Sequence, residues 1–369
     1  MSARRRLLSL AWFVIAVVYY TVARGIASVA ANGLASGHWF DFAYQAILLF
    51  LFIVGFAAMG YAGQKQFHPV IAMGLGFRPG GRREFALGAA IGWTGVAVCA
   101  LIIAVSGAMV VFFYTGWLQF ALIPLDLAIL LIASLAEEVA FRGYPFQRLS
   151  DATNPFFAML VLSGLYALAH ITNPGASPAS FLVTMFAGWL LTIAYLRTRA
   201  LWMGWGIHFA WNASMAVLFG LPLSGTTRFS PVITSTAIGS TWLTGFNYGP
   251  EGSAVGIVVM LALIPLTFWA TRGFSVQRST VSVPEDRGQG PRARGQEDSE
   301  PAGEREPGPI ITPPPDSLSD VQQPVPEQQS GNDENPLPQP QPEEQSPPEP
   351  VKKSEPPKAE PQSSRGNGE

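Results

Sequence analysis

The feature that most constrains this chain is a series of eight long apolar runs in its first 275 residues. About 20 apolar residues in a helix cross a hydrocarbon core about 30 Å thick. Backbone polar groups find no water inside a bilayer, so segments of this kind are helical. The runs therefore predict an all-α, polytopic membrane helix bundle of about eight transmembrane helices, near residues 7–28, 42–63, 85–112, 121–141, 156–170, 180–196, 200–219 and 254–271.

Arginine sets the expected orientation. Basic residues stand at the N-terminus and in the connectors after even-numbered runs: Arg4, Arg5, Arg6, Arg78, Arg82, Arg83, Arg142, Arg148, Arg197, Arg199, Arg272 and Arg278. Connectors after odd-numbered runs have almost none, and cytoplasmic loops carry such an excess. We expect a multi-pass protein of the cell (inner) membrane with both termini cytoplasmic and the 220–253 connector outside. The first run is longer than a usual signal-peptide core, so we expect an uncleaved first helix.

The composition changes near residue 276. Residues 276–369 are rich in Pro, Glu and Gln and contain no aromatic residue. Such a segment cannot bury enough apolar surface to offset the entropy of ordering it. The sequence thus predicts a helical bundle over 1–275 and a disordered cytoplasmic tail over 276–369, which acts as a spacer or binds an unidentified partner. The chain also lacks the basic, aromatic-rich patch of a nucleic-acid-binding protein.

Small residues in the third run predict close helix packing. Gly88, Ala89, Ala90, Gly92, Gly95 and Ala97 follow one another there. Small side chains let two helix backbones approach closely in a membrane. We therefore interpret this stretch as a packing surface and not as a cofactor site.

Four places inside the predicted helices carry polar groups that a bilayer disfavours. They are Asp126, the cluster of Glu137, Glu138 and Arg142, then His170, and the pair of His208 and Asn212. An ionisable group costs roughly 2.5 to 3.5 kcal/mol at the centre of a membrane helix, so each is a functional-site hypothesis. Asp126 lies near an outer helix end and is expected at the membrane interface, whereas His38 and His68 lie in connectors and need no role.

Helix geometry separates the two acids of the cluster. Residues four apart share a face, so Glu138 can pair with Arg142. Glu137 is left on a neighbouring face without a local counter-charge. Glu137, His170 and His208 are expected at different depths in the membrane. They can meet only if the helices tilt or if residues 143–145 form a short re-entrant piece.

Two chemistries fit these residue types. A carboxylate and a histidine can take a proton from water and return it to a leaving group, while a second histidine and an amide hydrogen-bond the oxyanion. Alternatively, Glu137, His170 and His208 could hold zinc and leave a position open for water. The single cysteine, Cys99, excludes a cysteine-based zinc site and an intramolecular disulfide. No H-E-x-x-H, Walker A or G-x-S-x-G motif indicates a commoner class.

At these residues the sequence resembles the CPBP (CAAX protease and bacteriocin-processing, or Abi) family of intramembrane proteases, which includes the type II CAAX prenyl endopeptidases. Three family motifs match in order over about residues 120–220. E-E-x-x-x-R is Glu137 to Arg142, F-x-x-x-H is Tyr166 to His170 with tyrosine for phenylalanine, and H-x-x-x-N is His208 to Asn212.

The resemblance implies an endopeptidase acting on a membrane-associated protein or peptide. By this likeness Glu137 and His170 activate the attacking water, His208 and Asn212 stabilise the oxyanion, and Glu138 and Arg142 support them. Two other functions stay open. One is a non-catalytic scaffold or chaperone-like relative of the family. The other is a proton-coupled transporter, a class whose sequences more often show paired broken helices. In the outer connector we expect residues 226–228 and 248–251 to be solvated turns.

Overall fold

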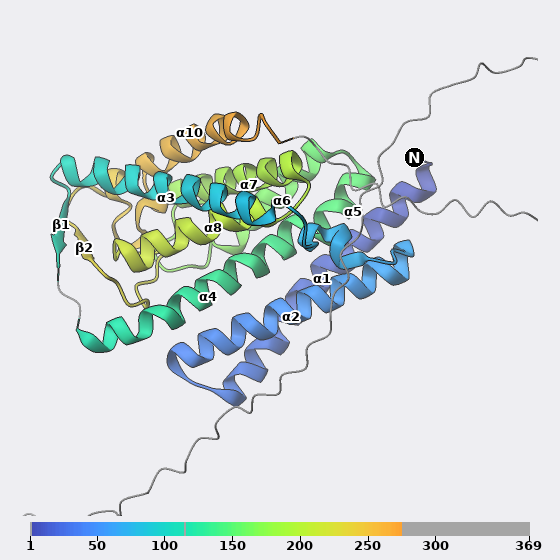
Figure 1. Cartoon of the computed structure of the whole chain (residues 1–369), viewed down its shortest axis with the longest axis horizontal. Coiled ribbons are helices and arrows are strands. Elements are labelled where there is room, and N and C mark those ends of the chain that lie inside the picture. The colour runs from blue at the N-terminus through green and yellow to red at the C-terminus, as the bar shows by residue number, and fades with distance from the viewer. Residues whose placement is uncertain (1, 114–115, 275–369) are drawn as a thin grey trace, which may run out of the picture. The chain divides into compact units, whose positions relative to one another are not determined.

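Each predicted span contains a helix in the computed structural model, which describes residues 2–113 and 116–274 (Figure 1). These helices are α1 (Ala3–Leu34), α2 (Gly37–Gln64), α3 (Gly81–Val105), α4 (Trp117–Arg142), α6 (Pro155–Ala169), α7 (Pro178–Thr198), α8 (Trp202–Ala213) and α10 (Ala254–Ala270). Within these residues, five segments are long and apolar enough to cross a membrane, and α6 and α10 are shorter apolar helices. The predicted all-α membrane fold is confirmed. The predicted tail, residues 276–369, lies outside the described residues.

The described residues contain ten α-helices, two more than the eight predicted spans. The two additional helices are short: α5 (Tyr144–Ala152) and α9 (Thr241–Thr244). Helix α5 follows a break at Gly143, where a Cβ would lie 2.4 Å from the carbonyl oxygen of Val139. Pro145 then stands in the first turn of α5, where its missing N–H costs nothing. The chain thus bends at the 143–145 segment.

The helix in the third span is shorter than the predicted range 85–112. Helix α3 ends at Val105, and Gly107 follows with a φ of 71°, which favours glycine. Residues Met109–Phe112 form strand β1, which pairs antiparallel with β2 (Thr234–Ala237). The β-branched pair Val110 and Val111 suits a strand. Apolar composition alone did not distinguish this strand from the end of a helix.

The remaining short elements are single turns. Two π-helical turns cover Ile71–Leu75 and Ser214–Leu218, and the second continues directly from α8. Two 3₁₀ turns, Phe246–Tyr248 and Pro250–Gly252, lead into α10. The 220–253 connector is therefore built of short elements.

Helices α3 and α8 pack with their backbones in close contact. A Cβ at Gly88 or Gly92 would lie 2.2 Å from a carbonyl oxygen of α8, and one at Gly206 would lie 2.1 Å from the carbonyl oxygen of Phe85. Only glycine leaves room for this approach. The predicted packing role of the glycines in α3 agrees with this contact.

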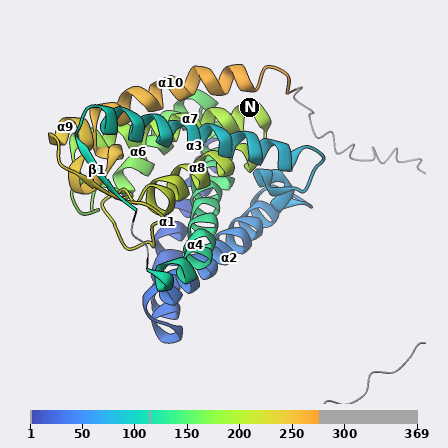
Figure 2. The ribbon, with the colours of Figure 1, turned by 60° about the vertical axis from the view of Figure 1, so that its left-hand side comes forward.

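Helix α4 runs between two groups of helices (Figures 1 and 2). The α1–α2 hairpin lies on one side of it, and α3, α7, α8 and α10 lie on the other. The buried apolar residues divide in the same way, into one cluster around α1, α2 and α4 to α6 and another around α3, α7, α8 and α10. Polar groups on α4 can therefore face both groups at once.

Candidate active site

Glu138 on α4 is the centre of a buried ion-pair network. Its side chain has no exposed surface, and its Oε1 accepts hydrogen bonds from Arg142 Nη1 at 3.2 Å and from His208 Nδ1 at 2.9 Å. The Arg142 guanidinium also lies 4.8 Å from the centre of the Tyr166 ring. The structure thus contains the Glu138–Arg142 pair expected from helix spacing, and it adds His208 as a third member.

These bonds orient the His208 ring. Because a carboxylate only accepts, the Nδ1–H of His208 donates to Glu138. Its other nitrogen, Nε2, then lies 3.6 Å from Glu137 Oε2 and 3.4 Å from the Tyr166 hydroxyl. A carboxylate behind an imidazole of this kind stabilises its protonated form.

Glu137 faces a cavity of about 400 Å³. Its Oε2 makes no hydrogen bond with any described residue, although it is close to His208. A buried carboxylate oxygen without a hydrogen bond is costly unless something binds it. One oxygen of Glu138 also lacks a hydrogen bond, but Glu138 has no exposed surface, whereas the Glu137 side chain is 36% exposed and lines the cavity.

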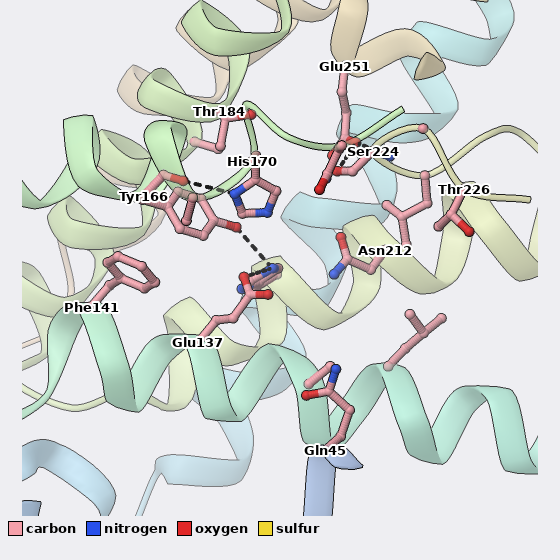
Figure 3. A pocket seen from close by; sticks show the side chains of 18 of the residues that line it. Gln45, Glu137, Phe141, Tyr166, His170, Thr184, Asn212, Ser224, Thr226 and Glu251 are labelled. Carbon is pink, nitrogen blue, oxygen red and sulfur yellow. Dashed lines mark hydrogen bonds and ion pairs between the residues drawn. The ribbon is translucent and has the colours of Figure 1, made fainter. Parts of the chain in front are cut away.

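His170 and Asn212 line the same cavity (Figure 3). His170 caps the C-terminus of α6, and its Nδ1–H donates to the carbonyl oxygen of Tyr166 at 2.8 Å. This bond leaves the lone pair of His170 Nε2 available. Asn212 lies one turn after His208 on α8. Three helices thus bring Glu137, His170, His208 and Asn212 to one cavity.

A zinc site is less well matched by this geometry. In residues 2–113 and 116–274, no group of three or more His, Cys, Asp or Glu side chains is arranged to hold a metal ion. Glu137 and His208 approach each other, but His170 does not complete a three-ligand set with them. Zinc bound by Glu137, His170 and His208 stays a prediction.

The model for the Rce1-like family, described as type II CAAX prenyl endopeptidase Rce1-like, matches residues 117–214. The predicted family likeness is confirmed. Searches of curated proteins and of solved structures gave no match.

The Rce1-like segment contains all six predicted site residues, from Glu137 to Asn212. Its family is one of proteases, which supports a peptidase activity for this chain. Together with the five membrane-capable helices, the match indicates a multi-pass membrane protein. The match does not assign roles to individual side chains.

The 220–253 connector, beyond the Rce1-like segment, adds a residue that the sequence did not indicate. Glu251 lines the cavity and accepts hydrogen bonds from Trp211 Nε1 at 2.9 Å and from Ser224 N and Oγ at 2.8 and 2.7 Å (Figure 3). Tyr248 is only 2% exposed. The expectation of a solvated turn at residues 248–251 was therefore wrong. Glu251 satisfies donors of the connector and of α8, and no sequence motif marks such a long-range bond.

Asp126 and His38 form a second interaction that the sequence did not predict. Asp126 has no exposed surface; its carboxylate contacts His38 Nδ1 at 2.6 Å and accepts from the backbone N–H of Ser230 at 2.7 Å. Asp126 is therefore buried against other helices, its expected position at the membrane interface stays a prediction, and His38 lies in the first turn of α2 with a buried partner. A buried carboxylate needs such partners to offset its lost hydration.

Arg24 on α1 also lines the cavity, and it was overlooked in the sequence. A signal for it existed, because Arg24 lies inside the predicted span 7–28. A charge within a membrane span marks a functional-site hypothesis by itself.

Proposed function

We propose that this chain is an intramembrane endopeptidase that hydrolyses a peptide bond of a membrane-associated protein or peptide. The observation that carries the proposal is the Glu137 carboxyl group, whose side chain is 36% exposed and lines a cavity shared with two imidazoles and an amide. A site of packing interactions alone would not need a carboxylate, two imidazoles and an amide around one cavity. The protease family of residues 117–214 supports the same reading.

In the proposed mechanism, Glu137 and His170 activate water. Glu137 accepts a proton as the water oxygen attacks the carbonyl carbon, and His170 Nε2 holds the same water through its lone pair. The proton then passes to the leaving amine nitrogen as the C–N bond breaks. General acid and base catalysis of this kind contributes roughly 10²- to 10⁴-fold.

His208 and Asn212 would stabilise the tetrahedral intermediate. Glu138 favours the charged His208 ring, so its Nε2–H can donate to the oxyanion, and the Asn212 amide can donate beside it. Arg142 acts through Glu138, because it does not line the cavity. We further propose a location in the cell membrane with both termini cytoplasmic.

A Glu137→Gln variant tests the proposal. The full chain is purified, reconstituted in vesicles and incubated with a pool of randomised peptides on a membrane anchor, and products are identified by mass spectrometry. We expect cleavage by the wild type and a loss of roughly 10²- to 10⁴-fold in the variant. Asp151→Asn is the matched control, since this acid is 41% exposed and does not line the cavity.

Two results would contradict the proposal. A folded Glu137→Gln chain that cleaves as fast as the wild type would remove the carboxylate from the chemistry. Wild-type vesicles that cleave nothing but carry a proton-coupled solute flux would favour the transporter alternative.

A further inference from the structure

Arg24 carries a charge inside the predicted membrane span of α1, and its side chain is exposed. It lies 10 residues before the C-terminal end of α1 and 21 residues after its start, or about 15 Å and about 30 Å along the helix. Within a membrane span, a charged side chain almost always faces the bundle interior or a water-filled cavity, where it has a partner. Arg24 lines the cavity of the proposed active site, so the identity of its partner concerns that site.

The other charged groups on the cavity wall have partners within the chain. Glu137 faces His208 at 3.6 Å, and Arg228 Nη1 contacts Asp41 Oδ1 at 2.7 Å. Both oxygens of Glu251 accept hydrogen bonds from protein donors. Among the described residues, no carboxylate forms an ion pair with Arg24. The wall therefore carries an unneutralised positive charge at α1.

The Arg24 side chain is held in place by neutral aromatic groups. Its Nη1 donates to the Tyr20 hydroxyl at 2.8 Å, and its Cζ lies 5.5 Å from the Tyr20 ring centre. The Tyr20 ring stacks on Phe52 and meets Phe141 edge to face. Phe141 lies one turn after Glu137 on α4, so this support connects Arg24 to the helix of the proposed catalytic acid.

The guanidinium keeps most of its binding capacity. It has five N–H donors, and its side chain hydrogen-bonds to Tyr20 and Tyr44, which leaves three donors. A planar, permanently charged fork with free donors binds a carboxylate well, often through two parallel hydrogen bonds. The anion that enters this cavity together with a scissile peptide bond is a carboxylate of the peptide itself.

We propose that Arg24 is a specificity-determining residue that binds a carboxylate of the peptide substrate while the bond to be cleaved lies at Glu137. This inference rests on the proposed endopeptidase function. The carboxylate is an Asp or Glu side chain or a free C-terminus, and both present the same group to the guanidinium.

The test uses the full chain in phosphatidylcholine vesicles and the anchored peptide pool, prepared once with free and once with amidated C-termini. We expect cleaved peptides to be enriched in Asp or Glu at a fixed distance from the cleaved bond, or in free C-termini, by roughly 10-fold or more, as for one charge-assisted pair. Arg24→Gln should abolish this enrichment, and Arg24→Glu should replace it with enrichment in Lys and Arg. Arg82→Gln, an exposed arginine of α3 away from the cavity, should change neither rate nor preference.

A binding measurement separates this inference from the proposed function. Retention of acidic and neutral peptide pools on vesicles that carry the Glu137→Gln chain does not depend on turnover. Equal retention overturns the role of Arg24 even if no peptide is cleaved by the wild type. Cleavage that depends on Glu137 but shows no preference for peptides with a carboxylate overturns the role of Arg24, while the endopeptidase function stands.

A lipid phosphate is the other anion to test. If activity requires phosphatidylglycerol in the vesicles, and Arg24→Gln removes that requirement without altering peptide preference, the guanidinium binds lipid and the inference is wrong.

Discussion

Replacing Arg142 by methionine should strongly destabilise the protein. Arg142 is 1% exposed, and it provides one of the two hydrogen bonds to Glu138, which has no exposed surface. Removing one partner of a buried pair leaves an uncompensated charge and costs about 3 to 5 kcal/mol. We therefore expect Arg142→Met to lower the free energy of unfolding by about that amount.

The double variant Glu138→Leu with Arg142→Met should recover part of this loss. It removes both charges and leaves mainly the His208 Nδ1–H without an acceptor, which costs about 1 to 3 kcal/mol. Unfolding is followed in mixed micelles at rising SDS fraction through the fluorescence of the 10 tryptophans. The control is Arg228→Met, because Arg228 is 59% exposed and its pair with Asp41 should contribute at most about 1 kcal/mol.

An Arg142→Met chain that unfolds like the control would contradict the dependence of Glu138 on Arg142. A double variant that is less stable than either single variant would also contradict it, since the two charges would then not depend on each other.

Two further predictions concern the cavity and its metal content. Glu251→Ala should reduce the rate of peptide cleavage by roughly 10-fold or more, because it removes the acceptor for Trp211 and Ser224. Glu251→Gln should restore part of the rate. An unchanged rate in the alanine variant would exclude a positioning role for Glu251. Because no three ligands are arranged to hold a metal ion among the described residues, elemental analysis of the purified full chain should find well below one zinc per chain. Glu137→Gln should not change this zinc content. One zinc per chain in the wild type that is lost in the variant would support the metal route.

Most of the membrane fold could be predicted from sequence because bilayer thickness and apolar composition constrain it directly. Every predicted span contains a helix, and the glycines of α3 pack as expected against α8. Short elements escaped prediction. Helix α5 depends on the bend at Gly143, and β1 depends on pairing with Thr234–Ala237 more than 100 residues away, which local composition does not encode.

The candidate site was predictable where helix spacing determines it. Spacing placed Arg142 beside Glu138 and left Glu137 without a local partner. The bond from His208 to Glu138 depends on how α8 meets α4, so spacing could not supply it. Glu251 was missed because its bonds join distant segments.

Arg24 is a different case. It was missed although a charge inside an apolar run had already been the criterion for the other site residues.

The most direct test of the account is a double-mutant comparison of Glu137→Gln and His170→Gln, measured as the rate of peptide cleavage by the reconstituted full chain. If both side chains activate one water, each variant should lose roughly 10²- to 10⁴-fold, and the double variant should be about as slow as the slower single variant. Losses that multiply in the double variant would show that the two groups act independently. A wild-type rate in either single variant would contradict the shared site altogether.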